Sequence, residues 1–248
     1  VEQYEDELET SGAGEELTEL VEQLGRHTRA LRSSVMEARL VPVQRVFSRF
    51  PSLARDLARQ QGKRVRVLME GGEVELDRSM VEALGDPLLH LVRNAVDHGI
   101  RLPEEREAVG KPPIGTITLH ASRFGDRVHV EVSDDGEGLD LQALHRRARD
   151  LGLADAHTRL SDQEAAELIF EPGFTTRQSS DAVSGRGIGL DVVRERANAL
   201  RGSLSVRSTP GEGVHFILGL PLTLTILPAL VFEAQGGTFA VPSAAVEG

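Results

Sequence analysis

A long amphipathic pattern near the N-terminus predicts the first helix. Between residues 15 and 47, apolar side chains recur at the three-, four- and seven-residue intervals of one helical face. They are Leu17, Leu20, Val21, Leu24, Leu31, Val35, Leu40 and Val43. A helix with one apolar face cannot bury that face alone, so the pattern predicts a partner helix. Pro42 lies near the end of the pattern, where it should kink or close the helix.

The middle of the chain alternates between helical and strand-like patterns, which predicts an α+β domain. Predicted helices cover residues 51–61, 140–151 and 162–169, and another begins near Ile188. Predicted strands cover residues 65–69, 115–121, 127–132, 203–208 and 213–220. Ser161 and Glu164 have the spacing of a capping box at the start of a helix. The Gly-, Ser- and Thr-rich stretch over residues 173–187 predicts a mobile loop.

The last part of the chain holds two further β-like runs, residues 226–234 and 238–241. Two strands are too few for an independent fold. We therefore expect them to begin another domain.

Residues 90–99 combine an apolar helical face with an unusual polar edge. Asp86 and Pro87 are the expected N-cap and first-turn residues, and Gly99 is expected to end the helix in a left-handed conformation. The polar edge carries two imidazoles, an amide and a carboxylate on one side of the helix: His90, Asn94, Asp97 and His98. The opposite side carries Leu88, Leu91, Val92, Ala95 and Val96. These polar side chains favour a nucleotide and metal site, and a plain surface helix is the alternative.

A carboxylate and two glycines follow the strand predicted over residues 127–132. Asp134 can accept a hydrogen bond from the exocyclic amine of adenine, and Gly136 and Gly138 let the backbone approach a ligand closely. An ordinary Asp–Gly turn has the same residues, so this segment alone leaves both interpretations open.

A second glycine-rich segment, residues 184–191, leads into the last predicted helix of the domain. Gly185, Gly187 and Gly189 precede the helix, where backbone N–H groups and the helix dipole can face a phosphate. The segment lacks the ending of a Walker A motif and the spacing of a Rossmann fingerprint, and protein-kinase signatures are absent. A plain loop-to-helix cap remains the alternative.

Composition excludes several classes of protein. The net charge of −11 over 248 residues disfavours general nucleic-acid binding. The absence of cysteine excludes a disulfide scaffold and a thiolate metal site. No apolar run approaches the roughly 18 residues of a membrane span, and the N-terminus has no secretory signal pattern. These features predict a soluble, cytoplasmic protein of one or two domains.

The order and spacing of the three polar segments resemble the GHKL nucleotide-binding superfamily, and within it the CheA-type chemotaxis histidine kinases. The resemblance runs from about Leu17 to the C-terminus. Five stretches are similar, in chain order, to the end of the family's dimerisation hairpin, its N box, its F box, its second glycine box and the junction with its regulatory domain: residues 38–51, 85–100, 169–176, 184–193 and 221–224.

The resemblance implies an α+β fold, a two-layer α/β sandwich of GHKL (Bergerat) type, preceded by a dimerisation helix and followed by a truncated β segment. The implied divisions are an acidic linker over residues 1–14 and part of the dimerisation hairpin over residues 15–53. The ATP-binding kinase domain would cover residues 54–222, and a coupling-protein-like β domain would start within residues 223–248.

The resemblance also implies a reaction: Mg-ATP is bound, and its γ-phosphoryl group is transferred to a histidine on a phosphotransfer domain supplied in trans. His90 and Asn94 would be catalytic, with Asn94 also binding Mg²⁺, and Asp134 would contact adenine. The other implied nucleotide-binding residues are Arg93, Asp97, His98, Gly136, Gly138, Ser184, Gly185, Gly187, Ile188 and Gly189. Implied partners are a response regulator, a coupling protein, chemoreceptors and a second copy in a homodimer, without nucleic acid or membrane insertion.

The chain departs from the family pattern at several positions. Ala143 stands where a basic residue is frequent, and Arg146 or Arg147 could replace its charge. Val214 and His215 stand in place of a threonine pair. The first helix of the dimerisation hairpin is missing, and no His-x-x-Lys-Gly site of a phosphotransfer domain occurs.

Three other functions are compatible with the same motifs. A GHKL ATPase that hydrolyses ATP typically has a glutamate base four residues before the asparagine, but that position is His90 here. A non-catalytic nucleotide-binding signalling scaffold is a second alternative. In the third, His27 is itself the phosphoacceptor, although Thr28 follows it where an acidic residue is usual.

Overall fold

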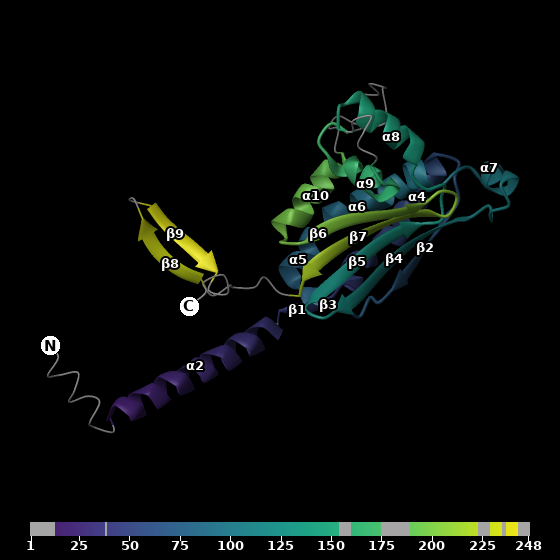
Figure 1. Cartoon of the computed structure of the whole chain (residues 1–248). Helices are drawn as coiled ribbons and strands as arrows, with labels where there is room; N and C mark the ends of the chain where they lie inside the picture. The colour runs from purple at the N-terminus through teal and green to yellow at the C-terminus, as the bar shows by residue number, and fades with distance from the viewer. Residues whose placement is uncertain are drawn as a thin grey trace. The chain divides into compact units, whose positions relative to one another are not determined.

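The computed structural model describes residues 13–37, 39–153, 160–174, 189–222, 229–234 and 237–242. The chain divides into two compact units, Val1–Val41 and Pro42–Gly248. Figure 1 shows the elements of each unit, which are described separately below.

The first unit contains a single long helix, α2 (Ala13–Glu37). Its apolar side chains at Leu17, Leu20, Val21, Leu24 and Leu31 are 60–68% exposed. This exposure agrees with the predicted need for a partner, because an apolar face of this length is unstable in water.

The helix ends earlier than the prediction, which continued it to about residue 47. A short strand, β1 (Leu40–Pro42), and a one-turn helix, α3 (Gln44–Phe47), follow instead. Pro42 lacks an N–H group and biases the residue before it towards an extended conformation. Val43, predicted to lie on the long helix, is fully buried in the second unit.

The second unit is built on a five-stranded sheet in the order β2-β4-β5-β7-β6. The strands are β2 (Val65–Glu70), β4 (Gly115–Phe124), β5 (Arg127–Asp134), β6 (Ser203–Thr209) and β7 (Gly213–Pro221). β2 pairs with β4 in parallel, and all the other pairs are antiparallel. All five strands were predicted, and each extends slightly beyond the predicted residues, β4 and β5 the furthest.

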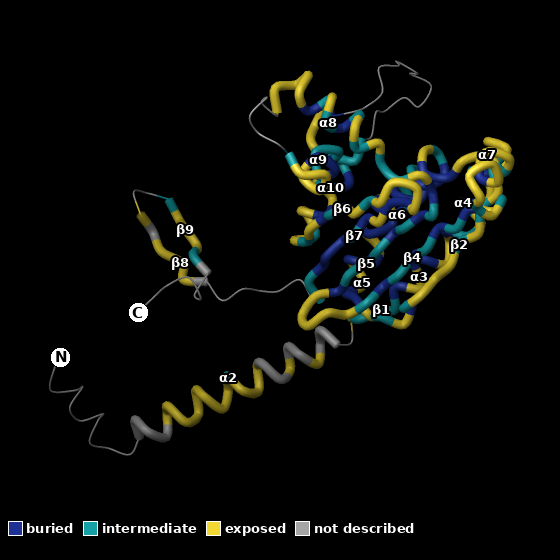
Figure 2. The backbone as a smooth tube through the Cα atoms, turned by 45° about the vertical axis from the view of Figure 1, so that its right-hand side comes forward, coloured by how far each residue is buried: buried dark blue, intermediate teal, exposed yellow. Residues whose placement is uncertain are grey.

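Helices cover one face of this sheet (Figure 1). They include α4 (Phe50–Gln60), α6 (Gly85–Asn94) and α10 (Leu190–Ala199). Side chains on the covered face are buried, among them Ile117, Leu119, Val130, Val132 and Leu218. The opposite face carries half-buried and exposed polar side chains such as Thr118, His120 and Glu131, and Figure 2 shows this contrast along the strands. The predicted α+β fold, a two-layer sandwich, is confirmed.

Shorter elements complete the second unit. They are β3 (Glu75–Asp77), α5 (Arg78–Ala83), η1 (Ala95–Gly99), α7 (Pro103–Ala108), α8 (Leu141–Asp150), α9 (Asp162–Glu167) and η2 (Leu168–Phe170). A small second core joins α8 to α9 through Leu144, Ala148, Ala165 and Phe174. The capping box is confirmed, because Glu164 N donates to Ser161 Oγ and Ser161 N donates to Glu164 Oε2.

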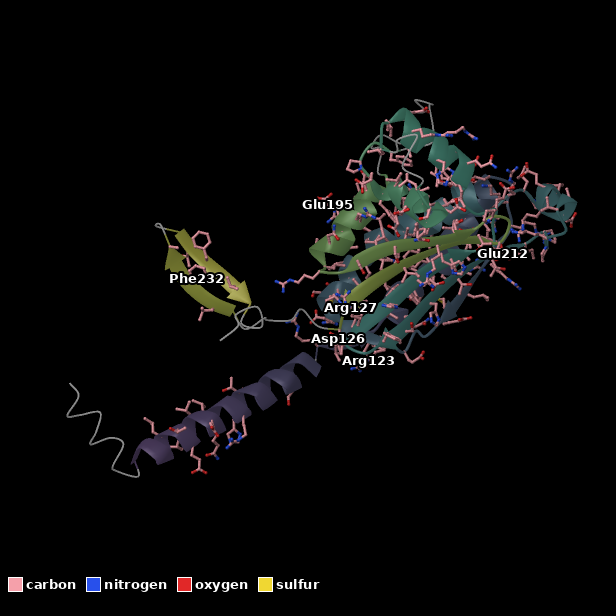
Figure 3. All side chains as sticks on the ribbon, viewed as in Figure 1. Arg123, Asp126, Arg127, Glu195, Glu212 and Phe232 are labelled. Carbon is pink, nitrogen blue, oxygen red and sulfur yellow. The ribbon has the colours of Figure 1, made fainter. Side chains whose placement is uncertain are left out.

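A separate hairpin, β8 (Ala229–Ala234) with β9 (Gly237–Pro242), follows the sheet domain in the sequence. Phe232 and Phe239 stack across it with ring centroids 5.8 Å apart, and Figure 3 labels Phe232. The two predicted β runs are therefore confirmed as a strand pair. Within the described residues, no helix combines the length and the hydrophobicity needed to cross a membrane.

Two leucines on neighbouring strands test the one-sided burial of the sheet. Leu119 is 0% exposed on the covered face, whereas Leu68 is 41% exposed on the open face. We expect Leu119→Ala to lower the free energy of unfolding by about 3–5 kcal/mol, because it leaves a cavity in the core. Leu68→Ala should cost less than about 1 kcal/mol. Chemical denaturation of the two variants measures both values, and equal losses would contradict the one-sided arrangement.

Candidate functional site

The helix that carries the predicted polar edge begins two residues earlier than expected. α6 starts at Gly85, and Asp86 lies in its first turn instead of capping it. Leu84 is the single residue between helices α5 and α6, and it has right-handed helical angles (φ −66°, ψ −18°). An N-cap residue needs an extended backbone, so the short junction between the two helices leaves no place for Asp86 as a cap.

The same helix changes its winding at the polar edge. α6 continues as η1, a π-helical turn in which Ile100 N donates to Ala95 O at 2.8 Å. A π-turn has one more residue than an α-turn and is frequent at functional sites. It turns the helix end towards the last residue of β5.

Gly99 was predicted to be left-handed, and this prediction is wrong because its φ is not positive. Glycine is required here by space instead. A Cβ on Gly99 would lie 2.7 Å from Asp134 Oδ1, and a Cβ on Gly136 would overlap the carbonyl oxygen of Gly99. The two glycines therefore let η1 pack directly against the end of β5.

The predicted division of the helix into two sides is confirmed. Leu88, Leu91, Val92, Ala95 and Val96 are buried. On the other side, His90, Asn94 and Asp97 are half-buried and His98 is exposed. Arg93, an implied nucleotide-binding residue, is also exposed.

Two residues that the sequence reasoning missed fix this edge. Gln61 Nε2 donates to Asp97 Oδ1 at 2.6 Å. Lys63 Nζ donates to the carbonyl oxygens of Val96 and Asp97 at 2.6 and 3.0 Å. Both partners come from the loop after α4, more than 30 residues earlier in the chain, so no local pattern could have indicated them.

The electrostatic environment keeps His90 uncharged. Burial lowers the pKa of His90, and the nearby positive charge of Arg93 lowers it further, while Asp191 and Asp97 oppose the shift. The imidazole of His90 is therefore neutral at neutral pH. Asp191 lies in the first turn of α10, so the structure brings the start of α10 close to the polar edge of α6.

Asp134 is the last residue of β5 and is only 8% exposed. Its Oδ1 accepts a hydrogen bond from Gly136 N at 2.9 Å. Burial raises the pKa of Asp134 to about 6, against the opposing effect of that hydrogen bond. Among the described residues, Oδ2 receives no hydrogen bond and remains available as an acceptor. In Figure 3, Glu212 marks the end of the sheet at which β5 terminates, and Arg127 marks the opposite end, where β5 begins.

A pocket of about 500 Å³ adjoins the turn that follows Asp134. Gly99, Gly136 and Gly138 form part of its lining, together with residues of α7 and of the β6–β7 turn. His90, Asn94 and Asp134 do not line it. The pocket is thus next to the candidate adenine contact and separate from the polar edge of α6.

The second glycine segment is described only at its end. Gly189 precedes α10 in an extended conformation (φ −79°, ψ 176°), and the helix begins at Leu190. Ser184, Gly185, Gly187 and Ile188 lie outside the described residues, as does most of the predicted loop.

The residues present fit a magnesium nucleotide. Mg²⁺ usually takes one or two protein oxygens and completes its shell with phosphates and water, so the single amide of Asn94 is an adequate ligand. No group of three or more His, Cys, Asp or Glu side chains in the described residues could hold a metal by itself. Asp134 offers an acceptor atom that no described residue uses, next to a turn whose Gly136 and Gly138 line the pocket.

Comparison with known proteins gives concordant results. The family model for histidine kinase-, DNA gyrase B- and HSP90-like ATPases matches residues 83–224. Chemotaxis protein CheA of Treponema pallidum is 45% identical over 223 residues, which cover 90% of this chain and 28% of that protein. CheA of Bacillus subtilis is 42% identical over 249 residues, which cover 99% of this chain and 36% of that protein.

The resemblance to CheA-type kinases that the motifs indicated is confirmed by these relatives. The chain spans about a third of the length of the curated relatives it matches. Among solved structures, the catalytic domain of histidine kinase ThkA covers 74% of this chain and 95% of its own, with 19% identity and a TM-score of 0.47.

The raised pKa of Asp134 predicts opposite pH effects on ligand binding and on stability. An adenine amine needs the charged carboxylate, so adenosine affinity should rise roughly tenfold between about pH 5 and pH 7. The folded-state pKa of about 6 exceeds the ordinary value of 3.8. The free energy of unfolding should therefore fall as the pH rises between these two values.

Asp134→Asn separates the two effects. Asparagine keeps an acceptor for Gly136 N but cannot ionise, so it avoids the cost of a buried charge. The variant should therefore melt at a higher temperature than the parent at pH 7 and show no such difference below about pH 4. It should also bind adenosine more weakly, without the pH dependence. Calorimetric titration and thermal melts measure both effects, and a parent whose adenosine affinity is flat across this range would contradict the assignment.

Proposed function

The chain belongs to the family of histidine kinase-, DNA gyrase B- and HSP90-like ATPases, and we propose that it is the ATP-binding kinase part of a CheA-type chemotaxis histidine kinase. The observation that carries this proposal is the packing of η1 against the end of β5. It brings the polar edge of α6 and the buried carboxylate of Asp134 to one side of the sandwich.

In this proposal, Asp134 contacts the adenine ring and Asn94 binds the metal. Asp134 Oδ2 accepts the exocyclic amine, whereas the space beside Gly136 and Gly138 is filled by the backbone of Gly99 and Thr209 and serves packing. Asn94, the last residue of α6, directly precedes η1 on the same polar edge and offers its amide oxygen to Mg²⁺. When bound, Mg²⁺ supplies positive charge that offsets the charge of the phosphate oxygens.

The proposed reaction is phosphoryl transfer to a histidine. A ring nitrogen of the acceptor histidine attacks the γ-phosphorus, the bond from that phosphorus to the bridging oxygen of ADP breaks, and the acceptor ring loses a proton. Such a reaction depends mainly on positioning and on charge stabilisation. The remaining implied residues, Arg93, Asp97, His98, the Ser184–Ile188 stretch and Gly189, would surround the phosphates.

His90 distinguishes transfer from hydrolysis in this proposal. A glutamate at this position would be a base for water, whereas the neutral imidazole of His90 can accept the proton that the acceptor histidine loses. The lowered pKa of His90 keeps the ring in that form at neutral pH. His90 would therefore face the γ-phosphate and the incoming acceptor.

The partners follow from the same proposal. The acceptor histidine would lie on a phosphotransfer domain supplied in trans, and a response regulator would receive the phosphoryl group. The exposed apolar face of α2 would pack against a second copy in a homodimer. Residues 223–248 would begin a β domain that binds a coupling protein and chemoreceptors in the cytoplasm.

The metal role of Asn94 predicts a selective loss. Asn94→Ala should weaken Mg-ATP binding by roughly 1–3 kcal/mol, because a charge-assisted contact is lost. Binding of metal-free ATP in excess chelator should change much less. Calorimetric titration under both conditions measures the difference, and Asn94→Asp, which keeps an oxygen ligand, is the matched control. Equal losses with and without metal would rule out the metal role.

The role of His90 predicts a slower phosphoryl transfer with little loss of nucleotide affinity. With radiolabelled ATP, the chain should label a phosphotransfer domain of the same system on histidine. His90→Ala should lower the transfer rate by roughly 10²–10⁴-fold, the usual contribution of a general base, while most of the ATP affinity remains. His120→Ala, on the open face of the sheet, is the matched control and should leave the rate unchanged.

A third variant tests the alternative acceptor. His27 is exposed on α2, and His27→Gln should not alter labelling of the added domain. Acid-labile label on the chain itself that disappears in His27→Gln would falsify transfer in trans and favour His27 as the acceptor.

A further inference from the structure

A buried arginine outside the predicted site is tied to the turn that follows Asp134. Arg106, on α7, is 2% exposed. Its Nε donates to the carbonyl oxygen of Pro112 at 2.7 Å. Its Nη1 and Nη2 donate to the carbonyl oxygen and to Oδ2 of Asp135 at 3.2 and 3.0 Å. Each guanidinium nitrogen therefore has an acceptor.

A lysine from the loop after α7 holds the same turn. Lys111 Nζ donates to the carbonyl oxygens of Asp135 and Gly136 at 2.7 and 2.6 Å. On the other side, Thr116 N donates to Asp135 Oδ1 at 2.9 Å, and Asp135 N donates to Thr116 O at 3.1 Å. We call Arg106, Lys111 and Asp135 the turn clamp.

The clamp reaches the candidate adenine contact through one shared peptide group, the one between Asp135 and Gly136. Gly136 N donates to Asp134 Oδ1, and the carbonyl oxygen of the same peptide group, that of Asp135, accepts from both Arg106 and Lys111. Because Gly136 also packs against Gly99, its peptide can move only if the clamp opens. The clamp thus holds the N–H donor of the Asp134 carboxylate without touching the carboxylate itself.

Stability alone is a weak explanation for this arrangement. Burying a guanidinium costs free energy, and a well-packed apolar residue is often at least as stable in its place. Apart from the bond of Arg106 Nε to Pro112, the side-chain hydrogen bonds of Arg106 and Lys111 all go to Asp135 or Gly136. Such convergence is what precise placement of one short turn requires.

We propose that Arg106 and Lys111 are positioning residues that make the site select adenine over guanine. This inference rests on the proposed contact of Asp134 with adenine. With the turn held, Gly136 N–H is occupied by Asp134 Oδ1, so the ligand meets only an acceptor. Adenine presents an amine there, whereas guanine presents a carbonyl oxygen, which the fixed carboxylate repels.

Loosening the turn would remove this discrimination. If the clamp opens, the Asp134 carboxylate can turn away and Gly136 N–H becomes available as a donor. A guanine carbonyl can then bind, because Gly136 N–H can donate a hydrogen bond to it. Lys111 also acts electrostatically, since its positive charge favours the ionised form of Asp134.

The test compares ATP with GTP on the full chain. Kd values for both nucleotides are measured by calorimetric titration for the parent, Arg106→Lys and Lys111→Gln. Each variant should lower the ratio of ATP to GTP affinity about tenfold, which corresponds to roughly one hydrogen bond. ATP should bind more weakly, and GTP should bind equally or more tightly. Arg106→Lys keeps the positive charge. If Arg106→Lys does not fold, Lys111→Gln provides the same test.

Two controls separate positioning from general damage. Leu218→Ala opens a cavity in the core of β7 and should leave the affinity ratio unchanged, whatever it does to stability. Arg101→Met removes an exposed arginine that lines the neighbouring pocket and pairs with Glu137, and it should also preserve the ratio. Equal weakening of ATP and GTP in the clamp variants would overturn the inference and leave Arg106 a purely structural residue.

Asp134→Asn separates this inference from the proposed function. If Asp134→Asn abolishes the preference for ATP while both clamp variants keep it, the clamp inference fails and the adenine contact stands. If Asp134→Asn also keeps the preference, the proposed adenine contact is wrong, and the clamp inference fails with it.

Discussion

The whole candidate site depends on the close approach of η1 to the end of β5. Gly99 and Gly136 have no room for a Cβ, because Asp134 and the Gly99 carbonyl fill that space. This contact buries a carboxylate that water would otherwise solvate, and burial in turn raises the pKa of Asp134 to about 6. A larger side chain at either glycine would separate the helix from the strand and release the carboxylate into solvent.

Burial makes the site costly to build, and the surrounding polar contacts offset that cost. Gln61 and Lys63 satisfy the side chain and carbonyl groups at the end of the α6–η1 helix, and the turn clamp satisfies the peptides after Asp134. Buried polar groups are tolerated when they are hydrogen-bonded. Among the described residues, Oδ2 of Asp134 receives no hydrogen bond, as expected of an atom that would contact a ligand.

The one-sided sheet explains why the site lies at its edge. Helices cover one face only, so the helix layer and the strand ends meet along a border where polar groups can be half-buried. His90 and Asp134 both lie at this border. Burial lowers the pKa of His90 and raises that of Asp134, because it disfavours the charged form of each. A neutral imidazole and a carboxyl poised near pH 6 are suited to a ligand that carries its own charge and metal.

The sequence by itself determined the main strands and helices and proposed most of the candidate residues, but it did not predict the short elements β1, α3, β3, α5 and α7. Hydrophobic periodicity predicted the five strands of the sheet and the amphipathic α6 helix. An element buried on one side has apolar residues at the spacing of that side, and this spacing can be read from the sequence. It misplaced the end of α2, the start of α6 and the conformation of Gly99, since junctions between elements depend on packing beyond the local pattern. Only the tertiary structure revealed Lys63, Arg106 and Lys111 as partners of the site, because each binds backbone carbonyls 24 to 34 residues away in the chain. A peptide carbonyl is the same in every residue, so no sequence pattern marks such an acceptor.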